Sequence, residues 1–307
     1  MGLHPQSEAY LRWMVKEKIP QLSTLSPSEA RIWDAKVAAL LNKDAHWDGR
    51  VENLRIPMRV GDRAARFYVP NPHASELLLY FHGGGWVLGN LDQTEHTCRL
   101  LGTETGRIVV SVDYGLAPEN KFPSGLEDCY GALTWIAENA DKIGATRERM
   151  AIGGDSAGGN LAAAVSLLAK DRGGPAIANQ ILIYPVTDIS DHIFVDYLDE
   201  LSPALTKADM TWFIRHYIQG KEDFRNQYAS PLIRSDLSGL PPALLITAEY
   251  DILTKQCNEY AKRLGDAGVR VNLAHYAGMV HGFFTLPDVF DDSHNAMNRI
   301  AQELSHS

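Results

Sequence analysis

The sequence is poor in cysteine. Its 307 residues include only Cys98, Cys129 and Cys257. An odd number of cysteines without CxxC spacing argues against a disulfide framework and against a zinc site. Small thiols of this kind usually fill space in a hydrophobic core. We therefore expect three reduced, buried cysteines, no bound metal and a cytoplasmic location.

Long apolar runs are also missing. A membrane-spanning helix needs about 20 apolar residues, whereas the longest uninterrupted run here is about as long as the stretch from Leu77 to Phe81. The opening residues, MGLHPQSEAYLRW, have neither the basic nor the apolar region of a signal peptide, and Gln6 stands where a myristoylation motif has Ser or Thr. We expect no membrane partner.

Positive charge is in deficit. The chain has 29 Lys and Arg against 38 Asp and Glu, a formal net charge of −9. No excess of basic residues is available to neutralise a phosphate backbone, so we expect no nucleic-acid partner. Between residues 173 and 206 there is no Lys or Arg but several acidic residues, and we interpret that stretch as a solvated acidic face.

What the chain does contain is an ordinary globular balance of 45% apolar and 22% charged residues, enough to bury a sizeable core. The apolar spacing predicts one helix over residues 7–19, ended by Pro20. A second helix follows Ser26, Pro27 and Glu29, which form a capping box with proline at the first helical position. Residues 1–50 therefore form a separate helical unit.

From residue 54 onward, eight predicted strands alternate with helices, which indicates an α/β fold with a mostly parallel sheet covered on both faces. A tight turn at Gly61-Asp62 makes the first two strands an antiparallel hairpin at the sheet edge. The predicted strands are 54–60, 65–69, 77–82, 107–112, 150–153, 180–184, 243–248 and 269–276, and the helices are 92–105, 124–140, 157–171, 254–267 and 291–305.

Residues 185–240 interrupt this alternation with a long insertion. It contains a predicted helix that begins at Thr206 and Asp209. An insertion of this length at the carboxyl ends of parallel strands is where a lid lies. We therefore divide the chain into a core of residues 51–184 and 241–307 and an insertion of residues 185–240.

The clearest chemical motif is Gly154-Asp155-Ser156-Ala157-Gly158, which joins a strand to a helix. This is the G-x-S-x-G nucleophile elbow in the structural context that the motif requires. Glycine is needed on both sides because a side chain there would collide with the neighbouring strand or helix. The motif predicts Ser156 as a nucleophile at the start of a helix, where backbone N–H groups favour negative charge.

A second motif, HGGGW, begins at His82. Consecutive glycines allow backbone N–H groups to face a ligand, as an oxyanion hole requires. We predict that the N–H groups of Gly83, Gly84 and Ala157 form that hole, and that His82 shapes the loop. A phosphate-binding loop is the alternative, but its lysine is missing and Leu88 occupies the third glycine position of a dinucleotide fingerprint.

A serine nucleophile needs a histidine base that is oriented by a carboxylate. Asp251 and His281 follow Ser156 in that order, and each comes directly after a predicted strand. Glu249 is the alternative acid, but we expect it to anchor a loop close to the sheet. The remaining histidines form no metal-ligand cluster such as H-E-x-x-H, so no metal is expected.

Taken together, the motifs resemble those of the hormone-sensitive-lipase-like carboxylesterases, the bacterial family IV of the α/β-hydrolases. The resemblance runs from residue 82 to residue 283 and keeps the family order. It rests on HGGGW (82–86), DYGLAPE (113–119), FP (122–123), GDSAGGNLA (154–162), YP (184–185), AEYD (248–251) and HGF (281–283).

This resemblance implies an eight-stranded core under a cap that is formed by the N-terminal helices and the 185–240 insertion. It also implies hydrolysis of short acyl esters through a covalent acyl-enzyme, without a cofactor. Large apolar side chains are then expected to wall the substrate pocket, although the same residues could equally be ordinary core. They are Trp13, Trp33, Trp86, Met210, Trp212 and Phe213.

Three residues depart from the family pattern: Gly115 replaces the Arg of DYRLAPE, Ile252 replaces the Pro of DPL, and Lys255 stands near a position that is usually acidic. Two other functions stay open beside ester hydrolysis. One is an amidase or deacetylase that uses the same triad, and the other is a receptor that binds a small molecule without turnover. The oligomeric state is also open, with a homodimer as one alternative.

Overall fold

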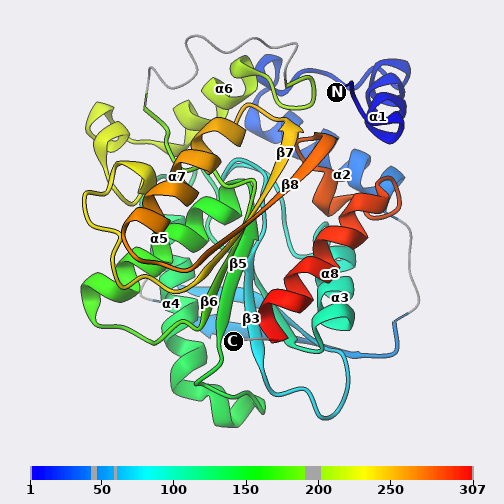
Figure 1. Ribbon diagram of the computed structural model, residues 1–307. Coiled ribbons are helices and arrows are strands. Elements are labelled where there is room, and N and C mark those ends of the chain that lie inside the picture. The colour runs from blue at the N-terminus through cyan, green and yellow to red at the C-terminus, as the bar shows by residue number, and fades with distance from the viewer. Residues whose placement is uncertain (1, 43–46, 59–60, 191–201, 306–307) are drawn as a thin grey trace.

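The computed structural model describes residues 2–42, 47–58, 61–190 and 202–305. Within them, an eight-stranded sheet runs in the order β1-β2-β4-β3-β5-β6-β7-β8 (Figure 1). Neighbouring strands from β4 to β8 pair in parallel, whereas β2 is antiparallel to both β1 and β4. The predicted mostly parallel α/β sheet is confirmed. Its strands are β1 (Arg50–Pro57), β2 (Asp62–Val69), β3 (Leu77–Phe81), β4 (Ile108–Val112), β5 (Ala151–Asp155), β6 (Asn179–Ile183), β7 (Ala243–Tyr250) and β8 (Val271–Val280).

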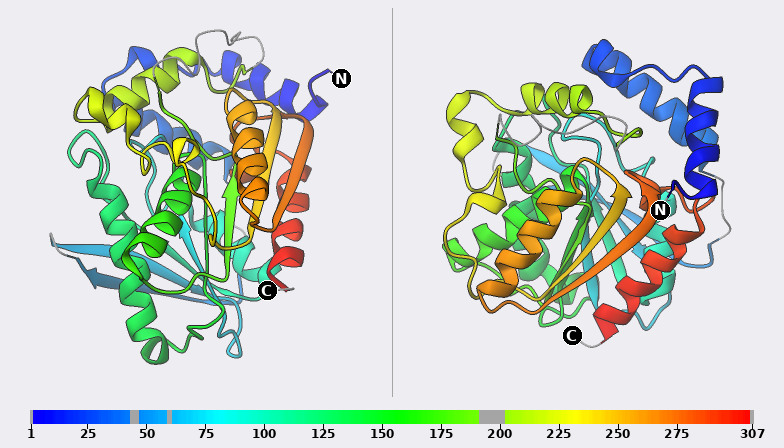
Figure 2. Two further views of the ribbon diagram at one scale, coloured as in Figure 1. Left: turned by 60° about the vertical axis from the view of Figure 1, so that its left-hand side comes forward. Right: turned by 45° about the horizontal axis from the view of Figure 1, so that its top comes forward.

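Helices cover both faces of the sheet, as Figures 1 and 2 show. Helices α4, α5 and α7 pack over one face, and α3 and α8 pack against each other over the opposite face. Each face has its own cluster of buried apolar side chains. The helices are α3 (Glu95–Thr105), α4 (Ser124–Asn139), α5 (Ala157–Arg172), α7 (Thr254–Asp266) and α8 (Asp291–Ser305).

The central strands are continuous apolar runs because both of their faces are covered. Strands β3 (LLLYF) and β4 (IVVSV) are buried at every position. Helix α5 (AGGNLAAAVSLLAKDR) is buried from Ala157 to Ala169. Its small residues let the helix lie close against β5, so Ser156, the residue between them, is held at the carboxyl end of that strand.

The first two strands form the predicted antiparallel hairpin at the sheet edge, with Pro57 opposite Asp62 as the last pair before the turn. Strand β1 begins at Arg50, four residues before the predicted start, and the predicted residues 59–60 lie outside the described chain. Strands β7 and β8 also extend beyond the prediction, to Tyr250 and Val280. These extensions carry both strands up to the site described below.

Two helices precede the sheet, α1 (Pro5–Lys16) and α2 (Pro27–Leu41). Helix α1 ends at Lys16 and not at Pro20, because the chain turns through a positive φ of 53° at Lys18. Helix α2 begins as predicted: the Ser26 N–H donates to the Glu29 carboxylate at 2.9 Å, and the Ser26 hydroxyl accepts from the Glu29 N–H.

Helices α1, α2 and α6 (Lys207–Tyr217) lie around the carboxyl ends of β7 and β8 in the upper part of Figure 1. The predicted capping box of Thr206 and Asp209 is present at the start of α6. Two hydrogen bonds join this insertion to the N-terminal segment. Asp209 Oδ1 accepts from the Ser23 N–H at 3.0 Å, and Trp212 Nε1 donates to the Leu25 carbonyl at 3.0 Å.

The cysteine prediction is confirmed, since all three cysteines are buried and free. The acidic-face prediction is wrong for Asp188, which is buried. Its backbone N–H donates to Gln256, and its carboxylate accepts from the Ser190 N–H. The other acidic residues of that stretch, Asp191, Asp196, Asp199 and Glu200, lie outside the described residues. Among the described helices, none is long and apolar enough to span a bilayer.

Candidate active site

Ser156 stands at the sharp turn between β5 and α5. Its φ of 54° and ψ of −115° are costly for a residue other than glycine. Three backbone hydrogen bonds hold the turn. The Ser156 N–H donates to the Ile183 carbonyl at 2.8 Å, and the Ser156 carbonyl accepts from the N–H groups of Asn160 at 3.0 Å and Val186 at 3.2 Å. The neighbouring strand and helix therefore fix a conformation that the isolated chain would avoid.

The glycines on either side of the turn leave no room for a side chain. A Cβ atom on Gly158 would collide with the carbonyl oxygen of Phe81, and a Cβ atom on Gly154 would collide with the same oxygen and with the Gly158 backbone. The elbow therefore packs backbone against backbone on the end of β3. This is the steric reason that the motif predicted for its glycines.

Three of the predicted site residues meet at this end of the sheet. His281 Nε2 lies 3.0 Å from Ser156 Oγ, and His281 Nδ1 lies 2.7 Å from Asp251 Oδ2. When Asp251 is ionised, its carboxylate accepts a hydrogen bond from the Nδ1–H group, which leaves the unprotonated Nε2 as the acceptor for the serine hydroxyl. The ring of Tyr184 packs against the imidazole with 4.5 Å between ring centroids.

The two carboxylates after β7 make different contacts. Asp251 is fully buried, and its Oδ1 accepts from the Leu253 N–H at 2.9 Å while Oδ2 faces His281. Glu249 Oε2 accepts from the Gly278 N–H at 2.7 Å, which ties β7 to an irregular part of β8. The carboxylate at the histidine is thus Asp251, and Glu249 holds the strand that leads to His281.

The glycine loop after β3 requires a correction to the predicted oxyanion donors. The Gly83 N–H donates to Asp155 Oδ1 at 3.0 Å, so it is not available to a substrate. Among the described residues, the N–H groups of Gly84, Gly85 and Ala157 donate to no protein atom. Gly85, which the sequence analysis passed over, takes the place of Gly83 in this set of unused donors.

Asp155 is a second residue that sequence reasoning missed. Its carboxylate accepts from the Tyr80 hydroxyl at 2.7 Å as well as from Gly83. Burial raises the pKa of Asp155, and its two hydrogen bonds oppose that effect. The sequence does contain a signal for this role, because Asp155 is an acidic residue inside the elbow motif, next to the nucleophile. It links the elbow to the glycine loop.

His82 shapes this loop without facing Ser156. Its Nδ1 lies 2.8 Å from the Gly83 carbonyl oxygen, and its ring stacks on Tyr114 with 4.4 Å between centroids. The Tyr114 hydroxyl donates to the His82 carbonyl at 2.8 Å. Burial lowers the pKa of His82, so the imidazole is neutral at ordinary pH.

The six predicted wall residues come from α1, α2, the glycine loop and α6. The Phe213 ring lies against Gly85, because a Cβ atom placed on that glycine would fall on the ring. Trp86 is buried and stacks on Tyr217 with 4.2 Å between centroids. Met210 is buried in α6. The other three make contacts elsewhere: Trp13 stacks on Tyr10, Trp33 lies beneath Lys36, and Trp212 bonds Leu25 and packs on His216.

Gly115, the first departure from the family pattern, is explained by Arg63 of β2. A Cβ atom on Gly115 would lie 2.7 Å from Arg63 Nη2, so this guanidinium occupies the space beside the glycine. Arg63 Nε donates to Asp128 Oδ2 at 2.7 Å, and the same oxygen accepts from the Gly115 N–H at 2.9 Å. Arg63 thus supplies the positive charge that position 115 lacks.

We expect Arg63→Met to destabilise the fold by about 2–3 kcal/mol, since it leaves the buried Asp128 carboxylate without its cation. Gly115→Arg alone should also destabilise, because its side chain collides with Arg63. In the double variant the Arg63 guanidinium is gone and Asp128 is left as a partner for the new arginine, so only the Asn120 side chain, 2.8 Å from the added Cβ, must still move. The loss should therefore be smaller than the sum of the two single losses. Urea unfolding of the four proteins measures this coupling, and simple additivity would contradict it.

The other two departures differ in their consequences. Ile252 carries an N–H that proline would lack, and this group donates to Ser202 Oγ at 3.0 Å. Ser202 is fully buried, so the bond anchors this part of the insertion beside Asp251. Lys255 is exposed on α7, and nothing in the structure gives it a role at the site. In the described part of the chain, no three or more His, Cys, Asp or Glu side chains are grouped so that they could hold a metal ion.

Comparison with known proteins agrees with this geometry. A model of the alpha/beta hydrolase fold family matches residues 78–285, about two thirds of the chain. The chain is 40% identical over 261 residues to the carboxylic ester hydrolase LipN of Mycobacterium tuberculosis, covering 83% of this chain and 69% of that protein. It is 35% identical over 300 residues to an arylesterase of Saccharolobus solfataricus, covering 94% of each.

Among solved structures, the hyperthermophilic esterase of the archaeon Pyrobaculum calidifontis superposes with a TM-score of 0.92 at 38% identity, covering 99% of this chain and 98% of that one. The likeness therefore includes the N-terminal helices and the insertion as well as the sheet. The chain belongs to the α/β-hydrolase fold family, in its hormone-sensitive-lipase-like carboxylesterase branch.

Proposed function

We propose that this protein is a carboxylesterase that hydrolyses short-chain acyl esters through an acyl-enzyme on Ser156. The observation that carries the proposal is the unbroken hydrogen-bonded chain from Ser156 through His281 to the buried Asp251. A hydroxyl, an imidazole and a carboxylate in this order are the components that acyl transfer needs. No cofactor takes part in the proposed reaction.

In the first half of the reaction, Ser156 Oγ attacks the ester carbonyl carbon and its proton passes to His281 Nε2. Asp251 accepts the Nδ1 hydrogen bond, which fixes the tautomer and stabilises the imidazolium. The tetrahedral intermediate then breaks its bond to the alcohol oxygen. His281 returns the proton to that oxygen, so the alcohol leaves neutral and the acyl group stays on the serine.

Charge that develops on the carbonyl oxygen is stabilised by backbone N–H groups. We assign this role to Gly84 and Ala157, with Gly85 in place of Gly83. Their N–H groups make no hydrogen bond to other described residues, so no internal bond must break when the oxyanion forms. Such preorganised donors supply a large part of the rate enhancement in acyl transfer.

In the second half, water takes the place of the alcohol. His281 removes a proton from the water as its oxygen attacks the acyl carbon, and the same donors hold the second oxyanion. The bond from the acyl carbon to Ser156 Oγ breaks, Oγ regains a proton from His281, and the carboxylic acid leaves. The enzyme returns to its starting state.

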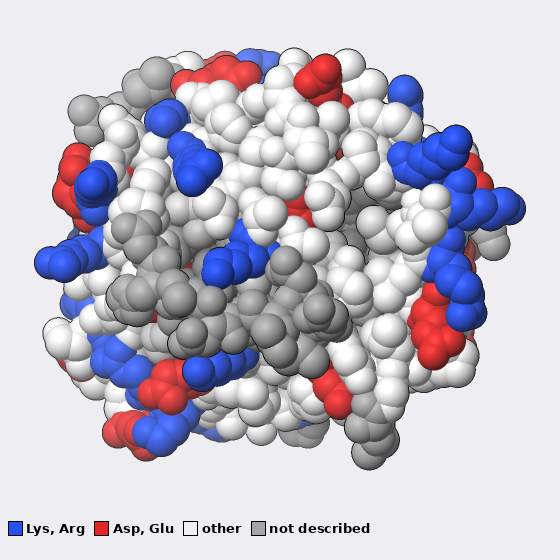
Figure 3. Space-filling view, turned by 90° about the horizontal axis from the view of Figure 1, so that it is seen from above, with Lys and Arg blue, Asp and Glu red and all other residues white. Residues whose placement is uncertain are grey.

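We further propose that residues 1–50 and 185–240 form a cap over a core of residues 51–184 and 241–307. The hydrogen bonds that join Ser23 to Asp209 and Leu25 to Trp212 support a single cap. In Figure 3, which views this end of the molecule, charged side chains of both signs lie mostly toward the rim.

Short acyl chains should be preferred, because the large apolar side chains of the cap, with Phe213 against Gly85, limit the space for the acyl group. We expect nitrophenyl acetate and butyrate to give a higher kcat/KM than nitrophenyl laurate. Steady-state kinetics over a series of nitrophenyl esters checks this. A preference for long-chain lipid emulsions would contradict it. The matching nitroanilides, run in parallel, should react far more slowly, and faster turnover of the anilides would identify an amidase instead.

We also propose a cytoplasmic location and a homodimer. Three free, buried cysteines support a reducing compartment. Strand β8 supports the dimer, because it is the last strand of the sheet and pairs only with β7 among the described strands. An edge strand of this kind can be covered by a second copy.

A further inference from the structure

Three successive residues of the glycine loop have a positive φ, and one of them is a tryptophan. Gly84, Gly85 and Trp86 have φ values of 100°, 58° and 61°, all in the left-handed half of conformational space. A tryptophan pays a steric cost there that glycine does not pay. A strained segment keeps its shape only when its surroundings over-determine it. Other groups of the protein must therefore hold the N–H groups of Gly84 and Gly85 in place.

Backbone hydrogen bonds provide part of this support. Within the loop, the Gly84 carbonyl accepts from the N–H groups of Val87 and Leu88 at 3.0 and 2.8 Å. The Trp86 carbonyl accepts from the Ala117 N–H at 2.8 Å. The second bond makes the geometry of the loop depend on the position of the neighbouring 113–119 segment.

One side chain of α2, that of Arg31, links the glycine loop to the 113–119 segment. Arg31 Nε donates to the Val87 carbonyl at 2.9 Å, and Arg31 Nη2 donates to the Ala117 carbonyl at 2.8 Å. A planar guanidinium has fixed donor directions, so it sets the spacing between these two carbonyl groups. Val87 is two residues from Gly85, and Ala117 is the residue whose N–H holds Trp86.

Glu119 keeps the guanidinium in this orientation. Its two carboxylate oxygens accept from Arg31 Nη1 and Nη2 at 2.8 and 2.7 Å, a bidentate pair. The hydrogen bond from Arg31 lowers the pKa of Glu119 to about 2. The pair therefore stays charged at any pH at which an esterase would be assayed.

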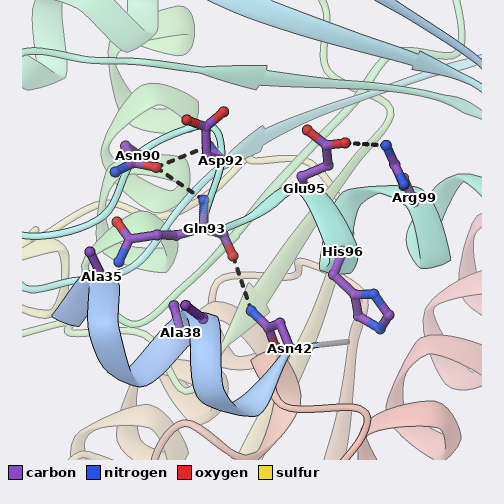
Figure 4. A pocket seen from close by; sticks show the side chains of 10 residues that line it. Ala35, Ala38, Asn42, Asn90, Asp92, Gln93, Glu95, His96 and Arg99 are labelled. Carbon is purple, nitrogen blue, oxygen red and sulfur yellow. Dashed lines mark hydrogen bonds and ion pairs between the residues drawn. The ribbon is translucent and has the colours of Figure 1, made fainter. Parts of the chain in front are cut away.

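Helix α2 has little other attachment to the core. Of its residues, only Ala30 is buried. The second half of α2 faces a cavity of about 440 Å³, which is lined on this side by Ala35, Ala38 and the following Asn42. Figure 4 shows Gln93 between the two alanines and the turn at Asn90. Among the polar contacts of the first half, those of Arg31 reach the glycine loop at Val87 and the 113–119 segment at Ala117, whereas a 2.7 Å bond from Gln93 Nε2 to Asp34 Oδ2 joins α2 to the turn that follows the loop.

We propose that Arg31 is a positioning residue of the reaction. By bridging the carbonyl groups of Val87 and Ala117, it sets the direction of the Gly84 and Gly85 N–H groups toward the oxyanion. This inference rests on the proposed function. It gives the N-terminal helix a part in transition-state stabilisation in addition to covering the substrate.

The test compares Arg31→Met and Arg31→Lys with Arg12→Met. Arg12 is the matched control, because it pairs with Glu8 on the exposed surface of α1 and contacts neither loop. Each protein is titrated with an organophosphonate, so that kcat is expressed per active site. Inhibition by a trifluoromethyl ketone is measured as well, since its adduct with Ser156 carries an oxyanion in the proposed hole.

We expect Arg31→Met to lower kcat by about 10- to 100-fold with little change in KM, because small misplacements of catalytic groups cost up to about 100-fold. The ketone inhibition constant should rise by a factor similar to the loss in kcat/KM. Arg31→Lys should recover only part of the loss, since an ammonium lacks the planar fork. The Arg12→Met control should match the wild type.

A merely structural role would lower thermal stability or the fraction of active sites and leave kcat per titrated site unchanged. That result, or full activity of Arg31→Lys, would overturn the inference. The Ser156→Ala variant is assayed in parallel. If it keeps turnover, the proposed function itself fails. If it is inactive while Arg31→Met behaves as the wild type, only the inference about Arg31 fails.

Discussion

Replacing Ser156 by alanine is expected to lower kcat by roughly 10⁶-fold, the loss seen when the serine of another triad is removed. Without the hydroxyl no acyl-enzyme forms, and the remaining oxyanion donors cannot supply the covalent step. The fold should be unchanged. Alanine and serine share the same Cβ atom in the strained turn, and the backbone hydrogen bonds to Ile183 and Asn160 remain.

Hydrolysis of nitrophenyl butyrate by purified Ser156→Ala protein checks this, with circular dichroism to show that the variant is folded. Ser166→Ala is the matched control. Ser166 is also a buried serine of α5, but its hydroxyl donates to the Ala162 carbonyl within the helix. The control should keep its activity. Near-normal ester hydrolysis by Ser156→Ala would show that the nucleophile lies elsewhere.

The second large effect separates the two carboxylates after β7. Asp251→Asn should lower kcat by up to about 10⁴-fold, because an amide at this position favours the wrong tautomer of His281. Glu249→Gln should cost far less. Its oxygen accepts a hydrogen bond from the Gly278 N–H, and the glutamine oxygen can accept the same bond.

Steady-state kinetics of both variants, with their unfolding curves, measure the difference. The comparison is balanced because each change removes one negative charge and keeps the shape of the side chain. If Glu249→Gln loses more kcat than Asp251→Asn, and both are folded, then the acid of the triad has been assigned to the wrong residue.

The sequence alone was sufficient for the sheet, the elbow and the three residues that meet there. Each of these has a local signal. Glycines mark the elbow because of a steric clash with Phe81, and Asp251 and His281 follow strands whose carboxyl ends share one edge of the sheet. Chain order, the loop position after a strand and the following Gly282 together then single out His281 among the eleven histidines.

What the sequence could not predict depends on contacts between distant segments. The sequence predicts Gly83 as an oxyanion donor, but its N–H donates to Asp155, which lies 72 residues later in the chain. The contacts of Arg31 with the 82–89 and 113–119 segments leave no periodic or motif signal in α2. The same holds for Arg63, whose guanidinium beside Gly115 is visible only once β2 is placed next to β4.

The backbone contact between Gly158 and Phe81 also limits how this enzyme can be altered. No side chain fits at position 158 or 154 without displacing β3 from the elbow. Almost no substitution at these two positions can therefore be used to change the substrate range. Many more substitutions can be used in α6, where Phe213 and Met210 can change in size without moving the strand that carries the nucleophile. Substrate range and catalytic geometry are thus open to separate engineering.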